Sequence, residues 1–148
     1  VGMSDAELAG CIAWVSHGFE IVFSPFPDWR FSGADCAAAF GLHGALYLGP
    51  RLPLTHSIFD QLPRFGIVLE GPDGKRLTGC GADVLDGPIR ALGYLLDTLA
   101  TDPGATPVGE GEIITTGTLT DAVPILPGDR WTSRLDGIDL PGATIAFR

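Results

Sequence analysis

The stretch "FGIVLEGPDGKRLTG", residues 65 to 79, carries the strongest β-hairpin pattern in the chain. Two runs of β-branched and aliphatic residues flank a turn made of Pro72, Asp73 and Gly74. Proline sets the φ angle that a tight turn needs, and glycine accepts a positive φ at its end. We therefore expect two antiparallel strands here, in a sheet that forms the centre of the fold.

Downstream of the hairpin, one helix and three more strands are predicted. Pro88 stands at a favoured first helical position, and apolar residues from Ile89 to Leu99 repeat at helical spacing. This pattern predicts a well-packed helix whose apolar face covers the sheet. Three β-like runs separated by Pro and Gly turns then follow: "EIITTG" (112–117), "DRWTSRL" (129–135) and "ATIAFR" (143–148).

Upstream of the hairpin, helices and strands alternate irregularly. Ser4 followed by Glu7 predicts a capping box and a helix from about residue 5 to 15. "FEIVFS" (19–24) predicts a strand, the alanines of residues 34–39 a short helix, and "GALYLG" (44–49) a buried strand. Because strands outnumber helices and no regular βα repeat is present, the predicted fold class is α+β.

Composition limits the class of protein. A chain of 148 residues with 45% hydrophobic residues can form one core, so we expect a single domain over residues 1–148. The net charge of −9, without a basic cluster, argues against nucleic acid as a partner. Charged residues make up only 18%, which indicates surface buried against another subunit.

Cysteine usage and hydropathy indicate a cytoplasmic protein without a membrane partner. Cys11, Cys36 and Cys80 are too far apart for a zinc site and too few for a disulfide framework. The longest weakly polar run, residues 36–50, is interrupted by His43 and is shorter than the ~20 residues of a membrane span. The first residues lack the pattern of a signal peptide.

Common motifs of nucleotide binding and of zinc or serine hydrolysis are absent. Four longer phrases stand out instead: "HGFEIVFSPFPDWRF" (17–31), "ADCAAAFGLHGALYLGP" (34–50), "GCGADVLDGPIRALGYLLDTLA" (79–100) and "GEGEIITTGTLTDAVPILPGDRW" (109–131). Over nearly the whole chain, these phrases resemble the fumarylacetoacetate hydrolase superfamily, specifically its 2-keto-4-pentenoate hydratase and 4-oxalocrotonate decarboxylase branch. The resemblance implies a mixed β-sheet roll of the fumarylacetoacetate hydrolase C-terminal domain type.

The resemblance also implies a metal site. The family holds Mg²⁺ or Mn²⁺ with three carboxylates, and Glu20 matches the third of them. A hard cation takes oxygen ligands, and as a Lewis acid it stabilises the enolate of a 2-oxo acid substrate. Thr116 and Thr118 match the segment that contacts the substrate carboxylate. Without the resemblance, Glu20 would be interpreted as a carboxylate at a strand edge, and not as a metal ligand. Thr116 and Thr118 would be interpreted as residues that favour strands, and not as substrate contacts.

Other polar residues near these phrases receive structural interpretations. His43 has an apolar neighbourhood typical of a core or interface histidine, so we assign it no catalytic role. His17 is expected either to orient the Glu20 segment or to cap a turn. Asp28, beside Arg30, is interpreted as part of a local ion pair or as a support for the site. The catalytic acid and base are left unassigned.

The resemblance is incomplete in one respect. The family's Glu-x-Glu pair has no counterpart before Glu20, and its proton-transfer lysine and acidic partner are also absent. Glu110 and Glu112 form such a pair too late in the chain to match. We therefore expect the C-terminal portion of a longer enzyme, with the N-terminal part missing and an incomplete site of its own.

These observations predict a metal-dependent hydratase or decarboxylase for small 2-oxo acids in aromatic-compound degradation. We expect a homo-oligomer or a complex with a related subunit. A carbon–carbon hydrolase like fumarylacetoacetate hydrolase is the alternative among enzymes, but the sequence suggests no His–Glu pair to activate water. The alternative that is not an enzyme is a non-catalytic partner subunit, or a fragment without a complete metal site.

Overall fold

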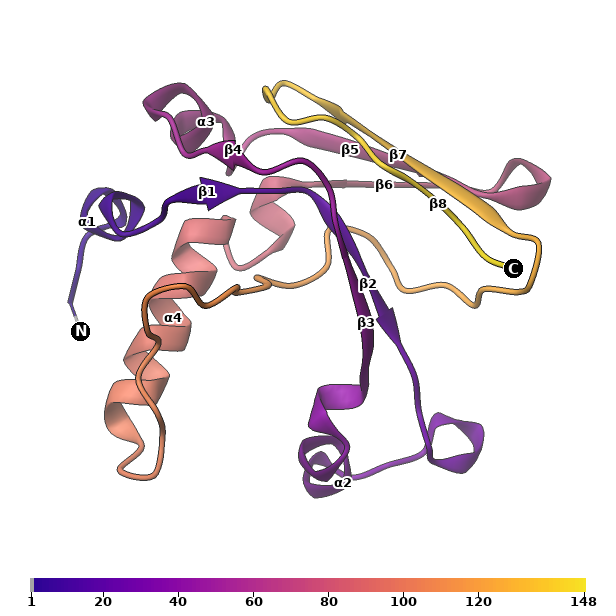
Figure 1. Cartoon of the computed structure of the whole chain (residues 1–148), viewed down its shortest axis with the longest axis horizontal. Coiled ribbons are helices and arrows are strands. Elements are labelled where there is room, and N and C mark those ends of the chain that lie inside the picture. Colours follow the sequence, from indigo (N-terminus) through magenta and orange to yellow (C-terminus); the bar gives the residue numbers. More distant parts are fainter. Residues whose placement is uncertain (1) are drawn as a thin grey trace.

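The largest sheet is built around the predicted hairpin. The computed structural model describes residues 2–148. In it, β5 (Gly66–Glu70) and β6 (Arg76–Cys80) pair antiparallel on either side of the turn η3 (Pro72–Gly74). β7 (Arg130–Asp136) pairs with the other edge of β5, and β8 (Thr144–Ala146) pairs with β7, so the strand order is β6-β5-β7-β8 (Figure 1). The hairpin and the last two predicted strands are confirmed.

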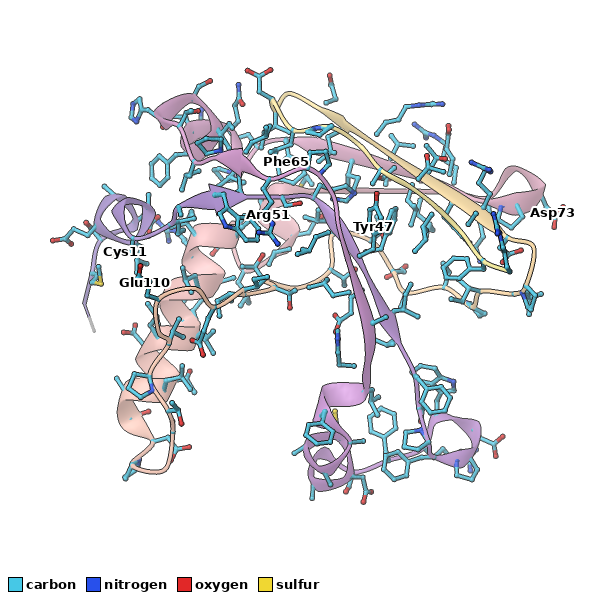
Figure 2. The ribbon with its side chains drawn as sticks, in the orientation of Figure 1. Cys11, Tyr47, Arg51, Phe65, Asp73 and Glu110 are labelled. Atoms are coloured by element: carbon cyan, nitrogen blue, oxygen red, sulfur yellow. The ribbon has the colours of Figure 1, made fainter. Side chains whose placement is uncertain are left out.

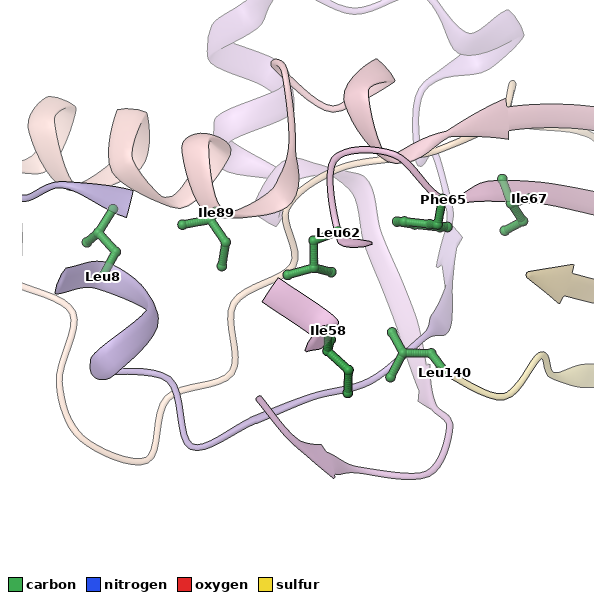
Figure 3. Packing of buried hydrophobic residues seen from close by; sticks show 7 residues of the cluster. All are labelled: Leu8, Ile58, Leu62, Phe65, Ile67, Ile89 and Leu140. Atoms are coloured by element: carbon green, nitrogen blue, oxygen red, sulfur yellow. The ribbon is translucent and has the colours of Figure 1, made fainter. Parts of the chain in front are cut away.

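The main core lies where this sheet meets the helices. Side chains of the middle strands alternate between buried and less buried positions, as period-2 geometry requires, and Ile67 and Trp131 point inward. Buried apolar residues from three helices and two loops complete the cluster (Figure 3): Leu8, Ile58, Leu62, Phe65, Ile67, Ile89 and Leu140. One cluster thus joins segments from both ends of the chain.

A long two-stranded ribbon leaves this body. β2 (Gly18–Val22) pairs antiparallel with β3 (His43–Leu48), and the residues between them form its tip (Figure 1). The tip consists of η1 (Pro27–Trp29), α2 (Gly33–Ala38) and η2 (Phe40–Leu42). We call residues 18–48 the arm. The strand in "FEIVFS" and the alanine-rich helix are confirmed, whereas β3 is mostly exposed and half-buried, so the prediction of a buried strand was wrong.

The arm is fixed at its base. β1 (Trp14–Val15) pairs with β4 (Leu52–Pro53), which leads into α3 (His56–Gln61). The Arg51 guanidinium lies over the Trp14 ring, 4.5 Å from its centre, and Figure 2 shows Arg51 at this junction. These contacts hold the two ends of the arm together where they enter the body.

Two predicted elements differ in the structure. The Ser4 capping box is present, but α1 covers only Asp5–Gly10, and residues 14–15 form β1 instead of a third helical turn. "EIITTG" (112–117) is irregular, because these residues pair with no strand. Both errors arise from strand pairing, which depends on residues far away in the sequence.

The long helix α4 (Pro88–Thr101) is confirmed, but its expected packing is not. It packs mainly against α1, where Ile89 and Ala91 are buried, and leads away from the sheet (Figure 1). Leu95 and Leu99, farther along the helix, are only half-buried. The helix therefore does not cover a sheet face.

The architecture as a whole is α+β, with helices and antiparallel strands in mixed order, as predicted. Cys11, Cys36 and Cys80 are all free thiols. Within residues 2–148, every helix is too short or too polar to cross a membrane.

Candidate functional site

Glu20 and His43 form a pair on one face of the arm. The Nδ1 atom of His43 lies 2.9 Å from Oε1 of Glu20, and the two side chains are 46% and 41% exposed. Nδ1 can donate its hydrogen to the carboxylate in this arrangement, which leaves the other carboxylate oxygen and Nε2 without a partner in the described residues. The pair is therefore accessible from solvent on one face of the ribbon.

A β-bulge brings these two residues to the same face. Ile21 pairs with Ala45 and Val22 with His43, so Gly44 is an extra residue on β3. One extra residue reverses the alternation of side chains beyond it, which moves His43 to the face that carries Glu20. A Cβ atom at position 44 would lie 2.9 Å from the Ile21 carbonyl oxygen, so glycine permits this close approach. Sequence reasoning missed the pair because it could not foresee the bulge.

This geometry corrects the interpretation of His43. The residue is about half exposed and is hydrogen-bonded to a carboxylate, so it is not a core histidine. A carboxylate that orients an imidazole is a common acid–base arrangement, and carboxylates and imidazoles both bind metals. A His–Glu pair is therefore present in the structure, and the expectation that no such pair activates water for carbon–carbon cleavage stays a prediction.

The described residues do not by themselves fit a Mg²⁺ site. Mg²⁺ is bound octahedrally by oxygen ligands, commonly one or two carboxylates with water and substrate oxygens. Within residues 2–148, no group of three or more His, Cys, Asp or Glu side chains is placed to hold a metal ion. Glu20 offers one carboxylate, half engaged by His43. Its role as a metal ligand stays a prediction.

Thr116 and Thr118 lie in the irregular segment after α4. The hydroxyl of Thr118 donates to the Thr120 carbonyl at 2.6 Å and closes a local turn, while Thr116 is half-buried. The same segment crosses β6, where a Cβ atom at Gly79 would overlap the Leu119 carbonyl. Among the hydrogen bonds of residues 2–148, none joins either threonine to Glu20 or His43. Their contact with substrate also stays a prediction.

His17 anchors the base of the arm. Its Nε2 lies 2.7 Å from Oγ of Ser133, a buried residue on β7, and that oxygen also accepts from the Ala143 N–H at 3.0 Å. Burial lowers the pKa of His17 below its ordinary value. Because His17 precedes β2 directly, this bond fixes the direction in which Glu20 leaves the body. The contact agrees with an orienting role for the His17 side chain.

Two other acidic residues, Asp28 and Glu112, lie in or beside turns. Asp28 has φ of 55° in an exposed turn and takes part in none of the ion pairs found in residues 2–148, so the ion pair expected with Arg30 is absent. Oε2 of Glu112 accepts from the Gly109 N–H at 2.7 Å and stabilises a turn. Neither residue adds a ligand to the Glu20 face.

Two surface hollows lie elsewhere on the body. A shallow one of about 470 Å³ runs along β7 and β8, and another of about 380 Å³ lies between α3 and the start of α4. Their walls include neither Glu20 nor the two threonines. The candidate site is thus an open face, without an enclosed pocket of its own in the described part of the chain.

Comparison of sequences defines the class of protein that the chain resembles, namely bacterial hydratases and decarboxylases of small unsaturated keto acids. No family model matches the chain. It is 28% identical over 138 residues to 2-hydroxyhexa-2,4-dienoate hydratase of Comamonas testosteroni, covering 93% of the chain and 50% of that protein. It is 29% identical over 132 residues to 2-keto-4-pentenoate hydratase of Paraburkholderia xenovorans, covering 89% and 48%.

The chain is also similar to a solved structure. 4-Oxalocrotonate decarboxylase from Pseudomonas putida G7, complexed with magnesium and adipate, matches with a TM-score of 0.83 at 27% identity. The match covers 100% of the chain and 54% of the decarboxylase. The resemblance inferred from the four phrases is therefore confirmed, and the chain spans about half the length of the curated relatives it matches.

Proposed function

We propose that the chain is part of a metal-dependent hydratase or decarboxylase that acts on small 2-oxo acids in aromatic-compound degradation. The main support is the likeness over the whole chain to a decarboxylase that was solved with magnesium and a small dicarboxylate. The hydratases that match at 28–29% identity add a second reaction of the same substrate class.

Within this proposal, Glu20 supplies one carboxylate to Mg²⁺ or Mn²⁺, because hard cations prefer oxygen ligands. The other ligands come from outside the described residues, since no group of three or more His, Cys, Asp or Glu side chains in these residues is placed to hold a metal ion. Thr116 and Thr118 bind the carboxylate of the substrate through a hydroxyl and neighbouring backbone N–H groups. His43 holds one oxygen of Glu20 at 2.9 Å, which leaves the other free to face a ligand.

The proposal extends to the protein's context. We assign the chain to the C-terminal portion of such an enzyme. Its fold is assigned to the β-roll of the fumarylacetoacetate hydrolase C-terminal domain type. Its assembly is assigned to a homo-oligomer or to a complex with a related subunit. The half-length match to the relatives and the low content of charged residues support these assignments. The three free thiols support a reducing, cytoplasmic location.

A second candidate is a non-catalytic partner subunit. The observation in its favour is that residues 2–148 contain no cluster of metal-binding side chains. A carbon–carbon hydrolase is less well supported, because the relatives described above are hydratases and a decarboxylase. The His43–Glu20 pair removes one argument against a hydrolase but does not outweigh this likeness.

The test is turnover by protein isolated from its native host, which retains any polypeptide or metal it needs. Turnover of 2-keto-4-pentenoate is measured as the loss of dienoate absorbance, and turnover of 4-oxalocrotonate is measured as the release of CO₂. We expect turnover of at least one, abolished by EDTA and restored by Mg²⁺. Absence of turnover with both would contradict the enzyme and support the non-catalytic subunit.

Binding of metal by the isolated 148-residue chain is a separate measurement. We expect Mg²⁺ to bind weakly or not at all in a calorimetric titration, because one carboxylate cannot replace several ligands. Micromolar binding would mean that additional ligands come together in solution, and Glu112 and Asp28 would be the first to test.

A further inference from the structure

The arm brings together a nitrogen and an oxygen donor, a combination that does not suit Mg²⁺. Nδ1 of His43 lies 2.9 Å from Oε1 of Glu20, and both side chains are open to solvent. Mg²⁺ takes oxygen ligands, whereas an imidazole nitrogen suits iron, nickel, copper and zinc. The donor atoms on this face therefore indicate an ion of a different class from the one that a cluster of carboxylates would hold.

The spacing of the two donor atoms matches that of neighbouring ligands on one ion. Bonds from a first-row transition ion to an imidazole nitrogen or a carboxylate oxygen are about 2.1 Å long. Two such ligands are ~3.0 Å apart when their bonds meet at a right angle and ~3.4 Å apart at a tetrahedral angle. The observed distance of 2.9 Å corresponds to the right angle. Right-angle coordination by nitrogen and oxygen is typical of Ni²⁺ and Cu²⁺.

An ion at this position replaces a hydrogen. In the metal-free pair, the hydrogen on Nδ1 of His43 lies between the two donor atoms. A neutral imidazole carries one ring hydrogen, which either nitrogen holds. When an ion binds Nδ1, this hydrogen moves to Nε2, where water accepts it. Binding to the neutral imidazole therefore releases no proton, and the negative charge of Glu20 remains to attract the ion.

The backbone holds both side chains on one face before any ion binds. β2 carries Glu20, and β3 carries His43, which pairs with Val22. The bulge at Gly44 turns His43 toward the face of Glu20, as described above. Donors on paired strands are positioned more precisely than donors on loops. The pair therefore needs only small side-chain rotations to bind an ion.

The other two histidines of the chain lack this arrangement. Nε2 of His17 lies 2.7 Å from the hydroxyl of the buried Ser133, so this nitrogen is already occupied. Nε2 of His56 lies 3.5 Å from Oδ2 of Asp60, a spacing that is too long for a right angle. These two side chains are also 90% and 55% exposed, so ordering them costs more conformational entropy. His56 with Asp60 thus provides a natural comparison within the same chain.

We propose that Glu20 and His43 bind one divalent transition ion with right-angle coordination, such as Ni²⁺ or Cu²⁺, through Oε1 and Nδ1. Water fills the other coordination positions, since both side chains are open to solvent. The net charge of −9 raises the concentration of cations near the chain. The inference goes beyond the proposed function in the class of ion, and it holds whether or not the chain catalyses the proposed reaction.

Calorimetric titration of the tag-free 148-residue chain with Ni²⁺ at pH 7 tests the proposal. We expect one saturable site per chain, which an equal concentration of Mg²⁺ does not compete for. His43→Asn and Glu20→Gln should each weaken binding at least about tenfold, because loss of even a supporting partner of a metal ligand costs about 10–100-fold. Circular dichroism verifies that both variants fold. His56→Asn is the matched control and should leave the affinity unchanged.

Nuclear magnetic resonance adds a site-specific measurement, because Ni²⁺ is paramagnetic. The signals of Leu46, which pairs with Glu20, should broaden or shift at lower Ni²⁺ concentration than those of Asp60. Absence of a saturable site, binding that survives both arm variants, an equal loss in His56→Asn, or displacement by Mg²⁺ would each overturn the proposal. Failure of the proposed function would appear separately, as absence of turnover by the native protein.

Discussion

The hydrogen-bonded pair of Glu20 and His43 should contribute little to the stability of the fold, although its atoms are only 2.9 Å apart. Both side chains are almost half exposed, so water screens their attraction and competes for their hydrogen bonds. Exposed pairs of this kind contribute about 0.2–1 kcal/mol. In a double-mutant cycle of Glu20→Gln, His43→Asn and the double variant, we therefore expect a coupling free energy below about 1 kcal/mol.

Urea unfolding at pH 7, followed by far-ultraviolet circular dichroism, gives the four unfolding free energies. The m-values must agree among the four proteins, because a changed slope would mean a changed denatured state. A coupling above about 2 kcal/mol would refute the reasoning, since the pair would then hold the arm together as a structural element. With a small coupling, the structural contribution of the pair is minor, and a loss of activity in Glu20→Gln can be assigned to the site.

Three further predictions concern the body of the protein. Because burial lowers the pKa of His17, this residue binds a proton more readily in the unfolded chain than in the folded one. Its contribution to the unfolding free energy should therefore be constant above pH 6.5 and fall below that pH. In urea titrations at several pH values, His17→Asn should lose this pH dependence. Leu8→Ala should lower the unfolding free energy by about 2–5 kcal/mol, because Leu8 is buried in the core. Leu95→Ala should lower it by only about 1 kcal/mol, because Leu95 is half-buried. Equal losses in urea unfolding would contradict the observed packing of α4. Gly71→Ala should lower stability by about 1–3 kcal/mol, because the added Cβ atom would overlap the buried Trp131 ring, and an unchanged melting temperature would show that the ring moves freely.

Sequence predicted those elements whose signals are local. The turn from Pro72 to Gly74 fixes the hairpin whatever surrounds it, and its two strands pair in the structure as expected. Pro88 and the apolar repeat after it define α4, and Ser4 with Glu7 defines the start of α1. In each case the chemistry that determines the element lies within a few residues of it.

Features that depend on distant contacts could not be predicted. The helical spacing continues to Val15, but β4 recruits residues 14–15 into a strand. The β-branched residues of 112–117 remain irregular because no neighbouring strand accepts them. The pairing of Glu20 with His43 required a bulge at Gly44, whose only sign in the sequence is a glycine within a strand.

The position of β5 in the middle of the main sheet has a consequence for the order of folding. Its partner β6 is joined to it by a short turn, but its other partner, β7, is far along the chain, with Gly66 paired to Asp136 about 70 positions away. Closing so long a loop costs entropy before the strand pairing contributes any stabilisation. Folding is slower in proteins that have more such contacts between distant residues. The β5–β6 hairpin should therefore form early, and β7 should join it at or after the rate-limiting step. On a ribosome, this edge of β5 would stay unpaired until residues 130–136 of β7 have emerged.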